Sequence, residues 1–138
     1  MRNALITGLY MTIAVLFSSF ASSRDFRTQQ LPAYDGTTTV DIFGTLQDVR
    51  EVRDPEGLNG VFLTVRGEKG LIDVYVAPID FLRDLGVVFT KGVPVQVKGS
   101  RVRLGGSNII LAREVRWKAS ITLTLRDARG RPFWKPPE

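Results

Sequence analysis

The stretch "LIDVYVAPIDFLRDLGVVFTKGVPVQVKG", Leu71 to Gly99, changes its hydrophobic period twice. Residues 71–77 alternate between apolar and polar side chains, which is typical of a half-buried strand. The segment "APIDFLRDLG" (77–86) then spaces its apolar residues as a helix does, with a proline near its start and a glycine at its end. Alternation returns in "VPVQVKG" (93–99). The stretch therefore predicts a strand, a short helix and a second strand in succession.

Two further alternating runs precede this stretch. The first, "TTVDIFGTLQDV" (38–49), contains Gly44, and a glycine inside a strand predicts a bend or bulge. The second, "VFLTVR" (61–66), is joined by the short hairpin loop "GEKG" to the strand at 71–77. These three runs predict a meander of three strands.

Two more predicted strands follow the short helix. Pro94 predicts an edge or strand-start position, and "SRVRL" can extend that strand past a kink at Gly99. A turn at Gly105-Gly106 leads into "NIILAREVRW", residues 108–117. Two sets of apolar positions compete to face inward in this last strand, and a β-bulge would reconcile them.

The order of these elements predicts an all-β fold: a five-stranded OB-fold-like barrel with a short helix between strands 3 and 4. Another small barrel, such as an SH3-like one, is the alternative, and the position of the helix favours the OB-fold. The segment "SITLTLRDARGRPFW" adds a C-terminal hairpin after the barrel. We therefore expect the barrel at residues 39–117 and the C-terminal hairpin and tail at 118–138.

The N-terminal residues have the composition of an export signal. Residues 1–21 combine a single early charge, Arg2, with an apolar run and a cleavage-like end at Ser19-Phe20-Ala21. An uncleaved anchor is the alternative, because the apolar run is near the length that spans a bilayer. We therefore expect a periplasmic or secreted protein, or one anchored in the inner membrane by this segment.

Residues 22–38 are polar, lack periodicity and predict a flexible linker. Two interpretations remain open for it: the linker is disordered, or it straps across the barrel through Phe26, Leu31 and Tyr34.

The residue types that the chain lacks exclude several kinds of chemistry. The chain has no His and no Cys, and both Met residues lie within residues 1–21. Zinc and copper sites, disulfides and a Ser-His-Asp triad depend on these residues. We therefore predict no metal site, no cofactor and no enzymatic activity. A hydrolase would have to use carboxylates such as Asp80 and Asp84, for which surface charge paired with Arg83 is the simpler explanation.

A candidate binding surface follows from the predicted fold, because OB-folds usually bind ligands across strands 2 and 3. Aromatic rings beside arginine can stack planar groups or sugar rings, and arginines on the closing strands can hold anions. In the alternative, the linker or the C-terminal hairpin covers these rings, and Phe133, Trp134 or Trp117 fills the groove. The candidate ligand-binding residues are Phe43, Phe62, Arg66, Tyr75, Arg101, Arg103 and Trp117.

The segments "FGTLQDV", "KGVPVQVKGSRV", "NIILAREV" and "LTLRDARGRPFW" resemble small exported bacterial OB-fold proteins, over roughly residues 39–134. Proteins of this group are mostly uncharacterised or are described as nucleic-acid-binding-like. The chain differs from the exported OB-fold haem chaperones, because their haem-attaching histidine has no counterpart here.

Three functions are consistent with these features. The first is an exported, non-enzymatic binding or adaptor module that contacts an envelope protein or polymer. The second is an oligosaccharide or single-stranded nucleic-acid binder that uses the aromatic face of strands 2 and 3. The third is a carboxylate-based hydrolase. Export argues against nucleic acid as a partner, and the net charge of +5 comes from interspersed residues, as on an ordinary solvated surface.

Overall fold

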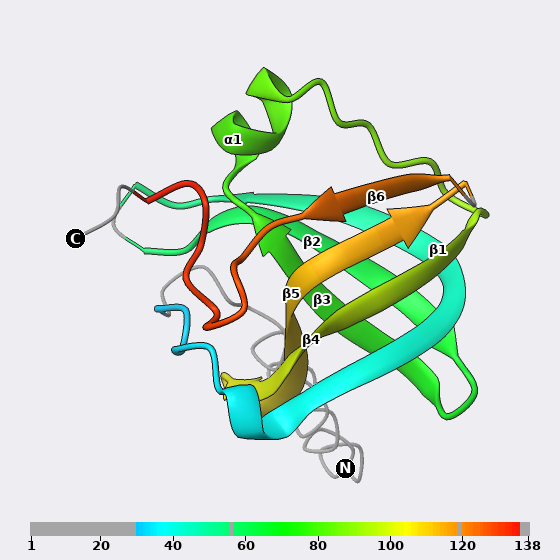
Figure 1. Cartoon of the computed structure of the whole chain (residues 1–138), viewed down its shortest axis with the longest axis horizontal. Helices are drawn as coiled ribbons and strands as arrows, with labels where there is room; N and C mark the ends of the chain where they lie inside the picture. The colour runs from blue at the N-terminus through cyan, green and yellow to red at the C-terminus, as the bar shows by residue number, and fades with distance from the viewer. Residues whose placement is uncertain (1–29, 56, 119, 136–138) are drawn as a thin grey trace, which may run out of the picture.

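The strands of the protein form one curled sheet in the order β3-β2-β1-β4-β5-β6 (Figure 1). The computed structural model describes residues 30–55, 57–118 and 120–135. Its elements are the 3-10 turn η4 (Gly36–Thr38), β1 (Thr39–Arg53), β2 (Asn59–Gly67), β3 (Gly70–Ala77), α1 (Ile79–Asp84), β4 (Pro94–Leu104), β5 (Ser107–Trp117) and β6 (Ile121–Thr124).

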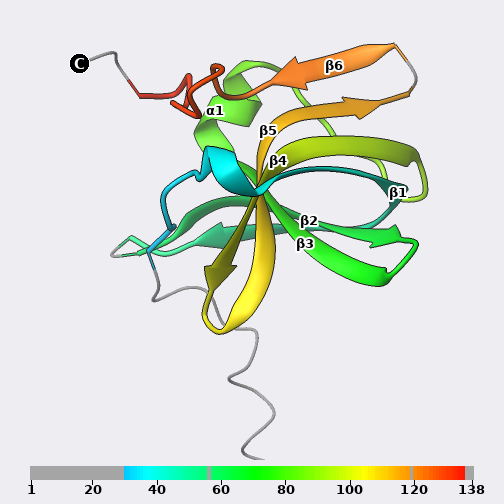
Figure 2. The same ribbon diagram turned by 60° about the horizontal axis from the view of Figure 1, so that its bottom comes forward.

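Parallel pairing between β3 and β5 closes the first five strands into a barrel. Asp73, Val74 and Tyr75 lie opposite Ile109, Ile110 and Leu111 in this pairing. The helix α1 lies between β3 and β4 in the chain, at one end of the barrel, and β6 pairs with β5 outside it (Figure 2). The predicted all-β arrangement, a five-stranded barrel with a short helix between strands 3 and 4 and an extra C-terminal strand, is thus confirmed.

The predicted export signal at residues 1–21 lies outside the described residues, as does the linker up to residue 29. Within the described part of the chain, no helix has the length and hydropathy needed to cross a membrane.

The long strand β1 has two different neighbours along its length. It pairs with β4 from Thr39 to Thr45 and with β2 from Thr45 to Arg53. Gly44 lies at the changeover, where a Cβ atom would collide with the carbonyl oxygen of Arg66 and approach Val65 Cγ1 to 2.7 Å. A shift of register between Leu46 and Asp48 adds a bulge directly after it. The bend predicted from Gly44 is therefore confirmed.

A β-bulge in β5 determines which of its apolar side chains face the barrel core. Lys98 pairs with Glu114 and Gly99 pairs with Ala112, so Arg113 is the extra residue. Because side chains alternate between the two faces of a strand, one extra residue exchanges the faces. Ile110 and Ala112 before the bulge, and Val115 and Trp117 after it, consequently all join the barrel core.

The barrel core consists mainly of branched aliphatic side chains from every barrel strand. Ile79 and Leu82 of α1 pack against it, and the helix stops at Gly86, whose φ of +71° suits glycine. The fully buried members of the core are Leu46, Leu63, Val65, Val74, Val76, Ala77, Val97, Ile110, Ala112, Val115 and Leu125.

The C-terminal hairpin returns over the barrel after β6. Leu125 is fully buried in the barrel core, and its carbonyl oxygen accepts a hydrogen bond of 3.0 Å from the backbone N–H of Phe133. An isolated bridge between Arg126 and Pro132 flanks the turn. The chain thus folds back as its sequence predicts.

The crowding at Gly44 provides a test of the fold. We expect Gly44→Ala to lower the free energy of unfolding of the full-length chain by about 2 kcal/mol, because the added methyl group forces β1 away from β2. Gly36→Ala is the matched control, since a Cβ atom there meets nothing within 4 Å. Urea unfolding measures both changes, and equal effects of the two substitutions would contradict this account.

Candidate functional site

The aromatic face of β2 and β3 is buried. Phe62 and Tyr75 are cross-strand neighbours on the outer face, as predicted, with ring centroids 5.3 Å apart in an edge contact. Their exposed fractions are only 0% and 3%. Both belong to a second apolar cluster, distinct from the barrel core, together with Leu58, Leu104, Ile109 and Leu111. These two rings are therefore not available to stack on a ligand.

Segments from both ends of the described chain cover this face. Leu31 and Tyr34 from the linker and Trp134 from the C-terminal hairpin pack against the second cluster. The Trp134 ring lies 6.5 Å from the Tyr75 ring and 5.5 Å from the Phe81 ring, edge-on in both cases. In Figure 1 the two covering segments, coloured blue and red, lie on the same side of the barrel. The alternative in which the chain covers its own aromatic face is the one that the structure shows.

Arg126 links the two covering segments. It is 6% exposed, and its guanidinium carbon lies 5.4 Å from the Tyr34 ring centroid and 5.1 Å from that of Trp134. Its Nη1 donates a hydrogen bond of 3.0 Å to the carbonyl oxygen of Gly130. Burial lowers the pKa of Arg126. Such contacts between a cation and aromatic faces are strongest when water is excluded, so Arg126 fastens the cover.

The buried polar groups of Tyr75 and Asp73 have structural partners. The Tyr75 hydroxyl donates to the carbonyl oxygen of Asn59 at 3.0 Å, and burial raises the pKa of Tyr75 to about 12. The buried carboxylate of Asp73 accepts a hydrogen bond from Thr64 Oγ1 at 3.1 Å and lies 3.3 Å from Arg50 Nη2. These groups therefore stabilise the fold.

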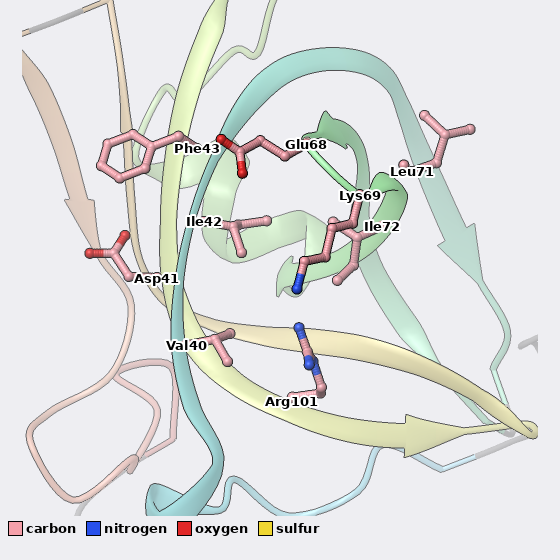
Figure 3. Close-up of a pocket in the computed structure, with 11 residues that line it drawn as sticks. Val40, Asp41, Ile42, Phe43, Glu68, Lys69, Leu71, Ile72 and Arg101 are labelled. Carbon is pink, nitrogen blue, oxygen red and sulfur yellow. The ribbon is translucent and has the colours of Figure 1, made fainter.

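An open groove of about 590 Å³ lies at the end of the barrel that carries the β2–β3 loop (Figure 3). Val40 and Ile42 of β1 point into it, and together with Ile72 they extend the barrel core outward. Two large apolar side chains are exposed nearby, Phe43 at 66% and Leu71 at 51%. The lining residues are Val40, Asp41, Ile42, Phe43, Gly67, Glu68, Lys69, Gly70, Leu71, Ile72 and Arg101.

Two cationic side chains face each other across this groove. The Lys69 ammonium and the Arg101 guanidinium point toward one another above the apolar floor, whereas the Glu68 carboxylate is directed away from them (Figure 3). Within the described residues, neither cation has an ion pair or a side-chain hydrogen bond. A pair of unsatisfied cations beside apolar side chains is suited to an anionic group that is carried on an apolar body.

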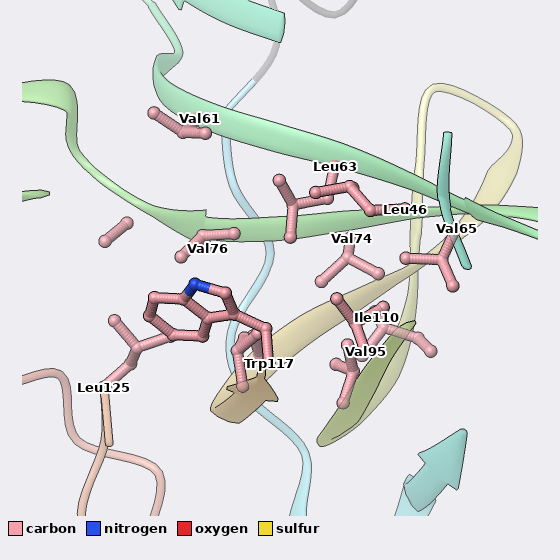
Figure 4. Close-up of a cluster of buried hydrophobic side chains, with 14 of the residues drawn as sticks. Leu46, Val61, Leu63, Val65, Val74, Val76, Val95, Ile110, Trp117 and Leu125 are labelled. Atoms are coloured by element: carbon pink, nitrogen blue, oxygen red, sulfur yellow. The ribbon is translucent and has the colours of Figure 1, made fainter. Parts of the chain in front are cut away.

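The other predicted site residues do not converge on the groove. Arg66 Nε donates to Gln47 Oε1 at 2.9 Å, and Arg103 Nη2 donates to the carbonyl oxygen of Gly106 at 2.9 Å. Trp117 is 5% exposed and points into the barrel core, where its ring lies 4.9 Å from that of Phe89 (Figure 4). Of the seven candidates, the structure brings Phe43 and Arg101 to the groove.

Sequence reasoning missed Lys69 and Arg126. The sequence places Lys69 in the hairpin loop "GEKG", and only the three-dimensional arrangement places it opposite Arg101. Arg126 follows directly after an alternating run, in "LTLRDARG", and nothing in that pattern distinguishes it from a solvated surface charge.

Asp80 and Asp84, the carboxylates considered for catalysis, do not line this groove, and neither does Asp48. Asp80 forms an ion pair with Arg83 at 3.1 Å, as its spacing predicts. Asp48 lies 3.3 Å from Lys91, whose hydrogen bond lowers the pKa of that carboxyl group. Among the described residues, no group of three or more potential ligands is placed to hold a metal ion.

The fold and the groove define a small β-barrel whose outer aromatic face is sealed by its own chain and whose open end carries paired cations. Residues 38–122 match the MamS/MamX magnetosome protein family, and the chain belongs to this family. No curated protein matches the chain. The matched residues include the five barrel strands and the groove, whereas Tyr34, Arg126 and Trp134 lie outside them.

A substitution of Trp134 tests whether the covering segments exclude water from Tyr75. We expect Trp134→Ala to lower the free energy of unfolding by about 2 kcal/mol, because a half-buried ring is lost. Water then reaches Tyr75, whose pKa should fall from about 12 toward the ordinary value of about 10. Phenolate absorbance measures the titration, and Tyr75→Phe assigns it.

The exposed neighbour Phe133, 54% accessible, is the control, and Phe133→Ala should change neither quantity. Because the pKa of Tyr75 is raised in the folded state, its contribution to stability is complete below about pH 10 and is lost as the pH rises through about 12. If the pKa of Tyr75 were unchanged in Trp134→Ala, Trp134 would not be what keeps water from Tyr75.

Proposed function

We propose that this protein is a non-enzymatic binding or adaptor module of the bacterial envelope, associated with the magnetosome, and that it contacts another protein through the groove at the end of its barrel. The observation that carries the proposal is the groove itself. Its floor is apolar, its cations Lys69 and Arg101 face each other, and it lies within the residues that match the family.

We place the contact surface at the groove because the aromatic face of β2 and β3 is covered. The face that OB-folds usually use is covered by Tyr34 and Trp134, so an oligosaccharide or single-stranded nucleic acid cannot stack on Phe62 and Tyr75 while these side chains stay in place.

Membership of the small exported OB-fold proteins is part of this proposal. It is supported by the strand order and by the helix between β3 and β4.

A non-enzymatic role is supported by the chemistry of the chain. It contains neither imidazole nor thiol, which supply most nucleophiles and general bases near neutral pH. Asp48, Asp80 and Asp127 are engaged in ion pairs, at 3.3, 3.1 and 3.0 Å respectively. Carboxylates that are held in this way stabilise local structure.

Export is the second part of the proposal. The apolar run and the cleavage-like end of residues 1–21 support a location on the non-cytoplasmic side of the envelope or magnetosome membrane. If the segment is not cleaved, it anchors the barrel there.

Cross-linking in magnetosome-forming cells tests the proposal. We expect the tagged full-length protein to fractionate with envelope or magnetosome membranes and to form a cross-linked complex of higher mass. Leu71→Arg should abolish this complex, because it places a charge on the apolar rim of the groove. Leu85→Arg is the matched control, since Leu85 is 53% exposed, Leu71 is 51% exposed, and Leu85 follows α1. Recovery in the cytosol, or equal loss of the complex in both variants, would contradict the proposal.

A further inference from the structure

The groove runs along an unpaired edge of β1. Residues 39–44 pair with β4 on one side, from Thr39↔Ser100 onward. On the other side the pairing with β2 begins only at Thr45↔Arg66, because β2 ends at Gly67 and turns into β3. In an antiparallel strand, alternate residues direct their N–H and C=O groups to opposite sides. Within the described residues, the groove-side backbone groups of residues 39–44 thus have no neighbouring strand.

The floor of the groove has the spacing of a strand-binding surface. Val40 and Ile42 are two residues apart on β1, so their side chains share one face at intervals of about 6.8 Å. Alternate side chains of an added strand recur at the same interval and would rest on this floor. The exposed edge of a sheet can accept a further strand when its side chains do not block the approach.

The charges of the groove select the side chains of that strand. Lys69 and Arg101 lie over the floor, neither has an acidic partner among the residues that the structure describes, and Glu68 is directed elsewhere (Figure 3). A carboxylate placed between an ammonium and a guanidinium gains two charge-assisted hydrogen bonds. A basic segment would be repelled at the same position.

We propose that the groove binds an extended acidic segment of a partner protein, which adds as a strand beside residues 39–44. Apolar side chains of the segment pack on Val40, Ile42 and Ile72, and one of its carboxylates binds between Lys69 and Arg101. This inference rests on the proposed function and specifies the partner's chemistry. An open backbone edge favours a peptide over a small amphiphilic anion, because only a peptide satisfies alternating N–H and C=O groups.

Fluorescence anisotropy with the full-length protein tests this inference. The probes are labelled peptides of about eight residues in which valine alternates with glutamate, or with lysine as the reverse-charge control. A third probe is the valine–glutamate peptide with alternate backbone nitrogens methylated on its strand-pairing side. We expect the valine–glutamate peptide to bind, and the other two to bind at least about tenfold more weakly.

Matched charge reversals locate the site. The double variant Lys69→Glu with Arg101→Glu should weaken binding of the valine–glutamate peptide at least about tenfold. The control is Arg103→Glu with Arg129→Glu, which makes the same change in net charge at exposed positions outside the groove. The control should bind as the wild type does, and thermal unfolding followed by circular dichroism confirms that both variants are folded.

Several outcomes would overturn the inference. Equal binding of the methylated and unmethylated peptides would exclude strand addition. Binding of dodecanoate without binding of any peptide would assign the groove to a small amphiphile. Failure of the wild type to bind the valine–glutamate peptide, while Leu71-dependent cross-linking persists in cells, would refute the acidic strand and leave the proposed function standing.

Discussion

The architecture depends on the close approach of β1 to β2 at Gly44. Because β1 pairs with β4 in its first half and with β2 in its second half, it must curl sharply. The curl brings the backbone of β1 at Gly44 close to the backbone of β2 at Arg66. A similar contact occurs at Gly99, where a Cβ atom would collide with the carbonyl oxygen of Leu111. These two glycines allow a sheet of ordinary strands to close on a core of valine, leucine and isoleucine.

The same curl creates the groove. β1 continues beyond the end of the β2–β3 hairpin, so its first residues keep one neighbour instead of two. The core side chains of these residues then lie half-buried at the barrel mouth, where none of the described strands lies beside them on the groove side. The groove thus results from unequal strand lengths, and its chemistry is set by the few side chains that surround the gap.

Most of the fold could be predicted from the sequence, because alternation, glycine and proline are local signals. The bulge in β5 was foreseeable from competing apolar positions, and the structure places it at Arg113. The candidate site was only partly predictable. Lys69 and Arg101 are separated by most of two strands and a helix, so their approach depends on how the barrel closes. The seal over Phe62 was open to two interpretations, because the polar linker around Tyr34 carries no periodic signal.

The contacts of Arg126 with the Tyr34 and Trp134 rings affect the order in which the protein folds. Tyr34 lies near the beginning of the described chain and Trp134 near its end, so the second apolar cluster joins segments of maximal sequence separation. Contacts of this kind form late, because the entropy of closing a long loop must be overcome first. A chain that emerges N-terminus first completes its barrel strands before Trp134 arrives. Trp134 cannot cover Phe62 and Tyr75 until the end of the chain has emerged, so a chain that is cut short leaves this aromatic surface without the C-terminal part of its cover.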